Sequence, residues 1–129
     1  MAQQDTPEPA RQAGHVLLVE DDESWAQTVR QILQRAGYEV LLAPDYRLAL
    51  EILESDRPVD LLLTDIVFPK RVNGVALGRM ARMRRGALPL LYMTAYDIPG
   101  LTAETDDTVL IKPISETDLV SAVERAMAH

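Results

Sequence analysis

The chain has 129 residues, close to the commonest size of a single domain, so one hydrophobic core is the default expectation. Its net charge of −7 opposes non-specific attraction to nucleic acid or anionic lipid, and no apolar run approaches the ~20 residues of a membrane span. The absence of cysteine excludes disulfides, thiolate chemistry and cysteine-ligated metal centres. We therefore expect a cytoplasmic protein with no nucleic-acid partner and no membrane partner.

The beginning of the chain differs in composition from the rest. Residues 1–14 are rich in Gln, Pro, Ala and Asp, show no periodicity and lack the apolar core of a signal peptide. We interpret them as a mobile tail, because they carry too little apolar surface to offset the entropy of ordering them. Residues 15–129 are predicted to form one domain.

Short apolar runs alternate with helical patterns along this domain. The predicted strands span residues 16–19, 38–43, 59–64, 88–93 and 109–111. Apolar residues at helical spacing follow four of these strands, and the helix starts are marked by the acidic group 20–23, Pro44–Asp45, Asn73 and Ser115. Between residues 95 and 108 the helical periodicity of apolar residues is poor, and Pro99 and Gly100 interrupt the segment, so we expect a short helix or an irregular loop there.

Continuous apolar strands that alternate with helices are typical of a sheet buried on both faces. The pattern predicts an α/β fold with a five-stranded parallel sheet, doubly wound, with helices on both faces. In such a sheet, ligands bind beyond the carboxyl ends of the strands. The side chains that directly follow the first, third, fourth and fifth strands are therefore the candidate site: Glu20 and Asp21, Asp65, Thr94, and Lys112.

The chemistry of this set is that of phosphoryl transfer. Three neighbouring carboxylates cannot all ionise cheaply unless a cation neutralises them, and all-oxygen ligation favours Mg²⁺. One carboxylate can then act as a nucleophile toward phosphorus. The ammonium of Lys112 and the hydroxyl of Thr94 suit phosphoryl oxygens.

Each residue alone also has a structural interpretation. The acids 20–23 can cap the first helix, Asp65 can be an ordinary loop acid, and Lys112 can be a solvated charge. The arrangement at four strand ends favours the functional interpretation. Further along, the basic run at residues 79–85 is interpreted as a solvated helix end rather than a docking site for an acidic partner, and Met80 and Met83 as core residues.

Five short segments follow one another at plausible spacing: 16–22 (VLLVEDD), 60–69 (DLLLTDIVFP), 73–74 (NG), 93–95 (MTA) and 111–113 (IKP). Together they resemble a response-regulator receiver domain, the phosphoacceptor module of two-component signalling. The resemblance extends from about Val16 to Met127. The combination of motifs in this chain is similar to that of receivers attached to hybrid histidine kinases and of some stand-alone regulators.

The resemblance implies a flavodoxin-like fold in which Asp65 accepts a phosphoryl group from a histidine kinase or histidine phosphotransfer protein. Lys112 would contact that group, Thr94 would move toward it, and the Lys112–Pro113 peptide would be cis. Such a domain catalyses its own phosphorylation and slow dephosphorylation without being a conventional enzyme. The Mg²⁺ ligands would be Asp21, Asp65, the backbone carbonyl of Val67 and, through water, Glu20.

The sequence departs from the family pattern in two places. Val109 stands where the family usually has an aromatic residue, and the segment between Thr94 and Lys112 is shorter than usual. We expect signalling through protein–protein interaction or onward relay, without a DNA-binding output domain. A homodimer is a further expectation. Two alternatives are a pseudo-receiver scaffold that takes up no phosphate and a metal-dependent hydrolase. The hydrolase is disfavoured because no Asp-x-Asp motif follows a strand.

Overall fold

The structure, a computed structural model, describes residues 14–67, 73–95 and 105–128. The strands are β1 (His15–Val19), β2 (Glu39–Ala43), β3 (Leu61–Asp65), β4 (Leu90–Thr94) and β5 (Thr108–Ile111). The helices are α1 (Glu23–Arg35), α2 (Tyr46–Glu54), α3 (Gly74–Arg85) and α4 (Glu116–Met127). Of the predicted tail, only Gly14 is described, and most of the segment 95–108, at residues 96–104, lies outside the described residues.

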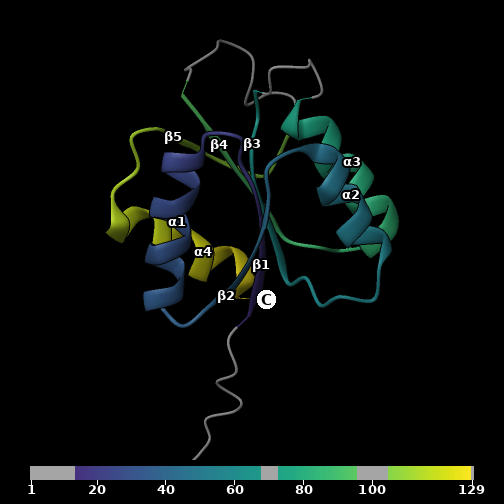
Figure 1. Cartoon of the computed structure of the whole chain (residues 1–129), viewed down its shortest axis with the longest axis horizontal. Helices are drawn as coiled ribbons and strands as arrows, with labels where there is room; N and C mark the ends of the chain where they lie inside the picture. Colours follow the sequence, from purple (N-terminus) through teal and green to yellow (C-terminus); the bar gives the residue numbers. More distant parts are fainter. Residues whose placement is uncertain (1–13, 68–72, 96–104, 129) are drawn as a thin grey trace, which may run out of the picture.

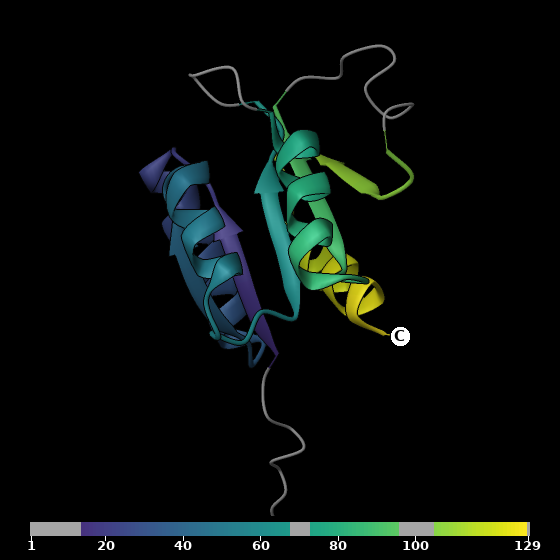
Figure 2. The same cartoon turned by 90° about the vertical axis from the view of Figure 1, so that its right-hand side faces the viewer.

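All five strands form one parallel sheet in the order β2-β1-β3-β4-β5. Helices α1 and α4 cover one face, and α2 and α3 cover the other (Figures 1 and 2). Side chains alternate along β1: Val16 and Leu18 pack under α1 and α4, whereas Leu17 and Val19 pack in the opposite cluster with α2 and α3. The predicted doubly wound α/β fold is confirmed, and the two-sided burial explains why the strands are continuously apolar.

Every described helix begins at a side chain that accepts a hydrogen bond from a backbone N–H in the first turn. The capping residues are Asp22, Asp45, Asn73 and Ser115. The helix starts predicted at Asp45, Asn73 and Ser115 are thus confirmed. Gly37, with φ of 99°, follows the end of α1. In the described part of the chain, no helix is long and apolar enough to cross a membrane.

The apolar face of α3 differs from the prediction. Met83 is 81% exposed and Met80 only partly buried, so interpreting both methionines as core residues was wrong. The buried face of α3 instead consists largely of small residues, including Gly74, Gly78 and Ala81, which bring the helix close to the sheet. In α2, Leu48 is 36% exposed and Ala49 is buried.

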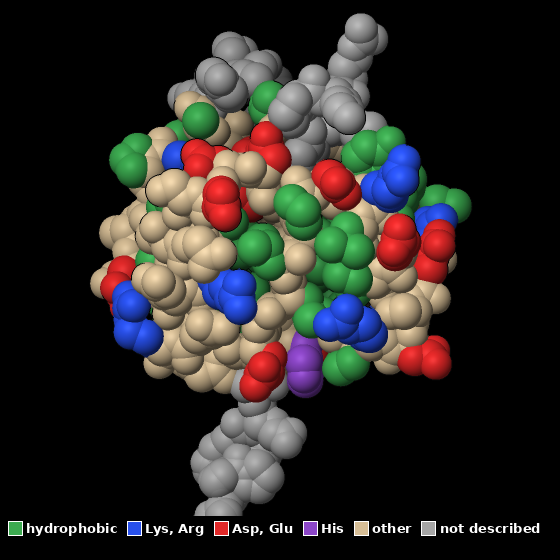
Figure 3. Space-filling view, viewed as in Figure 1, with side chains coloured by type: hydrophobic (Ala, Val, Ile, Leu, Met, Phe, Trp, Pro, Cys, Tyr) green, Lys and Arg blue, Asp and Glu red, His purple; other side chains and the backbone are tan. Residues whose placement is uncertain are grey.

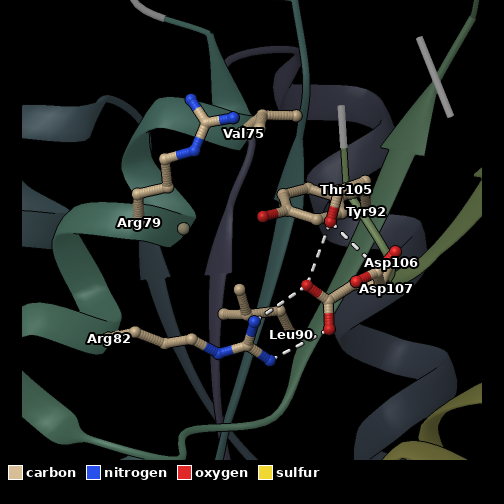
Figure 4. A pocket seen from close by; sticks show the side chains of 9 residues that line it. Val75, Arg79, Arg82, Leu90, Tyr92, Thr105, Asp106 and Asp107 are labelled. Carbon is tan, nitrogen blue, oxygen red and sulfur yellow. Dashed lines mark hydrogen bonds and ion pairs between the residues drawn. The ribbon is translucent and has the colours of Figure 1, made fainter. Parts of the chain in front are cut away.

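Arg79, Arg82 and Arg84 at the end of α3 are exposed, as predicted for a solvated helix end, whereas Arg85 is partly buried. The prediction missed that the last three arginines of the helix also bind acceptors in other parts of the fold. Arg82 makes two hydrogen bonds to the Asp107 carboxylate, of 3.0 and 2.9 Å, at an open pocket of about 310 Å³ between α3, β4 and the segment before β5 (Figure 4). Arg84 pairs with Glu54 at 2.8 Å. The guanidinium of Arg85 donates to four backbone carbonyls in and after the last turn of α2.

Candidate functional site

The candidate residues lie at or just beyond the carboxyl ends of their strands, at the edge of the sheet that is uppermost in Figure 1. Ladder bonds continue past the strand ends and fix the backbone there: the Glu20 N–H donates to Ala43 O at 3.1 Å, and the Lys112 N–H donates to Thr94 O at 2.8 Å. Asp65 is the last residue of β3 and lies beside Met93 of β4. Parallel pairing therefore places residues far apart in sequence at the same level.

Lys112 lies between two of the predicted acids. Its Nζ donates to Glu20 Oε1 at 3.0 Å and to Asp65 Oδ2 at 3.1 Å. Glu20 is 2% exposed and Asp65 7%, so both ion pairs are shielded from water and are stronger than surface pairs. The Lys112–Pro113 peptide is cis, as expected.

Asp21 completes an acidic cluster. One carboxylate oxygen from each of Glu20, Asp21 and Asp65 can be chosen so that all lie within 4.8 Å of one another. Asp21 is exposed, in contrast to the two buried acids, and so provides the side of the cluster that faces solvent. Acidic side chains are visible at this end of the molecule, where α1 begins (Figure 3).

Burial and hydrogen bonding act in opposite directions on the charges of the site. Burial raises the pKa of the Glu20 carboxyl above its ordinary value, although hydrogen bonds from the Asp22 N–H and Lys112 oppose this shift. For Lys112, burial alone would lower the pKa, but hydrogen bonds to Glu20 and Asp65 raise it overall. The lysine is therefore held in its charged form by its two acidic partners.

Thr94 and Val67 lie at the carboxyl ends of β4 and β3. Thr94 ends β4 and is fully buried, next to Ile111 in the sheet register. Val67 follows β3 and is 41% exposed, and its N–H lies 3.4 Å from Asp65 Oδ1. The roles of the Thr94 hydroxyl and the Val67 carbonyl stay predictions.

Gly74 has a structural role that sequence reasoning missed. It is the first residue of α3, and a Cβ at this position would overlap the backbone carbonyl oxygen of Asp65. The Gly74 N–H also donates to Ile66 O at 2.7 Å. Only glycine allows this close approach of α3 to the backbone beside Asp65. The Asn73–Gly74 motif was the sequence signal for this close approach, but the sequence prediction took from it only the helix cap at Asn73 and part of the resemblance.

Comparison with known proteins agrees with this geometry. A sequence model of the response regulator receiver domain matches residues 16–124. The response regulators MprA of Mycolicibacterium vanbaalenii and Mycobacterium ulcerans are 37% and 38% identical to this chain over 111 residues. These matches cover 82% of the chain but only 47% of each relative, so the chain spans about half the length of these curated relatives.

Solved structures give the same result over nearly the whole chain. The Vibrio cholerae chemotaxis protein CheY4 aligns with a TM-score of 0.79 and 29% identity, covering 88% of this chain and 98% of CheY4. The receiver domain of the hybrid histidine kinase CckA aligns with a TM-score of 0.76 and 32% identity, covering 88% and 99%. From the family match, the curated relatives and the site geometry, we conclude that the chain belongs to the response regulator receiver domain family.

Proposed function

We propose that this receiver domain takes a phosphoryl group from a phosphohistidine onto the carboxylate of Asp65. The observation that carries the proposal is the 3.1 Å contact between Lys112 Nζ and Asp65 Oδ2 in an acidic cluster at the sheet edge. Asp65 is the last residue of the central strand β3, and at 7% exposure it is slightly more accessible than Glu20, at 2%, which also contacts the lysine. This is a suitable environment for an aspartyl phosphate.

The proposed transfer forms a bond between a carboxylate oxygen of Asp65 and phosphorus and breaks the N–P bond of the donor histidine. The electron pair of that bond returns to the imidazole nitrogen. Lys112 would stabilise the negative charge of the transferred oxygens, and the Thr94 hydroxyl would donate a hydrogen bond to one of them. Later attack by water on phosphorus would release phosphate and restore the carboxylate.

The donor set fits a divalent cation. Three carboxylates and one ammonium leave a local charge of −2 (three negative, one positive), and all side-chain donors are oxygens. Receiver domains generally bind Mg²⁺ at such an acidic pocket. Asp21, Asp65 and the Val67 carbonyl would hold the ion, with Glu20 acting through water. When bound, the ion would neutralise phosphoryl charge during transfer.

The partners follow from the chemistry. Receiver domains interact with histidine kinases or histidine phosphotransfer proteins, and one of these would be the donor here. The phosphoryl group adds ~1 to 2 negative charges beside Lys112 and Thr94, which would change the affinity for a downstream protein. A homodimer and a cytoplasmic location stay predictions.

The direct test uses acetyl phosphate as the donor, with and without Mg²⁺. We expect acid-labile phosphate on the wild type only when Mg²⁺ is present, and none on Asp65→Asn. Asp56→Asn is the matched control, because Asp56 is an exposed acid outside the site and its loss should leave labelling unchanged. Undiminished labelling of Asp65→Asn would reject the assignment.

The alternative, a scaffold that is never phosphorylated, is motivated by Val109. This residue lies beside Tyr92 in the sheet register, and its small side chain packs against the cluster on the α2–α3 face. A scaffold would bind neither Mg²⁺ nor beryllofluoride, an analogue of the phosphoryl group. Tight Mg²⁺-dependent binding of beryllofluoride, observed by ¹⁹F NMR, would therefore exclude the scaffold.

A further inference from the structure

Trp25, the only tryptophan of the chain, lies next to the acidic cluster without being one of its predicted members. It is in the first turn of α1, where its backbone N–H donates to the capping carboxylate of Asp22 at 3.2 Å. Its side chain packs against the cluster on the α1–α4 face and passes close to the site. The centre of the indole ring is 5.8 Å from Lys112 Nζ.

The ammonium of Lys112 thus has two kinds of neighbour. The carboxylates of Glu20 and Asp65 accept its hydrogen bonds, and the π face of Trp25 lies within cation–π range. The Lys112 side chain is 18% exposed, so little water competes for the cation. A lysine stem has four rotatable bonds, and a neighbour that limits its rotamers lowers the entropy lost when the ammonium binds a ligand.

The indole N–H indicates which part of the Trp25 side chain matters. Within the described residues, Trp25 Nε1 is buried and has no hydrogen-bond partner. Buried donors are normally paired, so a tryptophan selected for its N–H would have an acceptor here. The ring face, by contrast, has a charged neighbour. Phenylalanine would keep an aromatic face and remove the unpaired donor, whereas leucine would keep only apolar bulk.

We propose that Trp25 is a positioning residue whose aromatic face holds the Lys112 ammonium in place beside Glu20 and Asp65. Trp25 itself touches no reacting atom and acts through the lysine. The functional part of the proposal rests on the proposed phosphoacceptor role of Asp65. The positioning part does not, because it describes the protein before any phosphoryl group binds.

The sequence contains only two lysines, Lys70 and Lys112, which makes the first test simple. Protein labelled with ¹³C at lysine gives two sets of ε-CH₂ signals, which Lys70→Arg assigns. We expect the Lys112 ε protons of the wild type, without metal, to be shifted upfield by the indole ring current. This shift should remain in part in Trp25→Phe and disappear in Trp25→Leu. Ordinary shifts for Lys112 in the folded wild type would overturn the proposal even if Trp25→Leu does not fold.

The second test measures the affinity for beryllofluoride in the presence of Mg²⁺ by ¹⁹F NMR. We expect Trp25→Leu to weaken binding about three- to tenfold, which corresponds to the loss of one cation–π contact. Trp25→Phe should stay within about twofold of the wild type. Gln27→Leu, an exposed change on the same helix, controls for altered helix stability and should have no effect.

The outcomes separate the two proposals. If Trp25→Phe and Trp25→Leu lose affinity equally, the indole N–H rather than the ring face is the important group, and the positioning proposal is wrong. If the wild type binds no beryllofluoride, the proposed phosphoacceptor role fails, while the lysine spectra still decide whether Trp25 positions Lys112. Equal affinity of Trp25→Leu and the wild type would also overturn the proposal.

Discussion

In two regions of the molecule, Lys or Arg side chains are bound by hydrogen-bond acceptors, but the two regions differ in net charge. At the carboxyl edge of the sheet, Lys112 faces two buried carboxylates, and Asp21 adds a third negative charge within the cluster. At the end of α3, Arg82 pairs with Asp107 and Arg85 donates to backbone carbonyls. The first region carries negative charge in excess, whereas in the second each of these cations has an internal acceptor.

This difference separates function from stability. A cluster with excess negative charge gains free energy when a cation arrives, so it is suited to binding a metal ion and then a phosphoryl group. The guanidinium groups of Arg82 and Arg85 already have acceptors within the protein, so they gain little from a further ligand. Arg85 connects α3 to α2, and Arg82 connects α3 to the segment before β5. Substitutions in the two regions should therefore affect different measurements.

The largest expected effect is that of Asp21→Asn on metal binding. It removes one of the three charges of the cluster, so the apparent affinity for Mg²⁺ should fall about 100-fold, measured by calorimetry. Because Asp21 is exposed, the free energy of unfolding should change little. The matched variant is Asp22→Asn, which removes the neighbouring charge but keeps a good helix cap. Equal losses of affinity in both variants would mean that general charge, rather than the cluster, binds the ion.

The next effect is that of Gly74→Ala on the rate of phosphorylation. The added methyl group would overlap the Asp65 carbonyl oxygen and displace the acceptor backbone, so the rate should fall about 10- to 100-fold. Gly78→Ala is the comparison, since its Cβ would overlap the Tyr92 hydroxyl one turn further along α3, away from the acidic cluster. It should lower stability and leave the rate of phosphorylation per folded molecule close to that of the wild type.

In the arginine region, Arg85→Met should lower the free energy of unfolding by about 2–3 kcal/mol. The change removes charge-assisted hydrogen bonds to carbonyls at the end of α2, including those of Ile52 and Leu53. Urea denaturation measures this loss, and phosphorylation of the folded protein should be unchanged. Arg47→Met, at an exposed position of α2, provides the control. A loss of phosphorylation without a loss of stability would contradict the division between the two regions.

The smallest effect is expected for Arg84→Gln. Arg84 pairs with Glu54 at 2.8 Å, but the two side chains are 33% and 54% exposed, so water screens the interaction. The free energy of unfolding should fall by less than about 1 kcal/mol, and the difference should shrink further in high salt. A loss as large as that of Arg85→Met would show that ion pairing, rather than the carbonyl contacts, connects α2 and α3.

The fold was predictable because its signals are local. Apolar runs such as residues 16–19, the caps at Asp45 and Ser115, and the glycine after α1 each fix an element from a few neighbouring residues. The buried face of α3 was not predictable in the same way. The buried face of α3 is formed by Gly74, Gly78 and Ala81 among others, and Met83 lies on the opposite face of the helix, where it is 81% exposed.

The candidate site was predictable because a parallel sheet brings strand ends together. Placing Asp65 at the end of one strand and Lys112 after another was enough to expect their contact. The roles of Trp25 and Arg85 were not, since they depend on which way a side chain leaves its helix and what it then meets. A pattern of residue types does not contain that information.

The most direct measurement is to locate the phosphoryl group. After reaction with acetyl phosphate and Mg²⁺, the acyl phosphate can be reduced with borohydride and the altered residue identified by mass spectrometry of peptides. We expect modification of Asp65 alone, and none when Mg²⁺ is chelated. Modification of a different residue, or equal modification of Asp65 without Mg²⁺, would contradict this expectation.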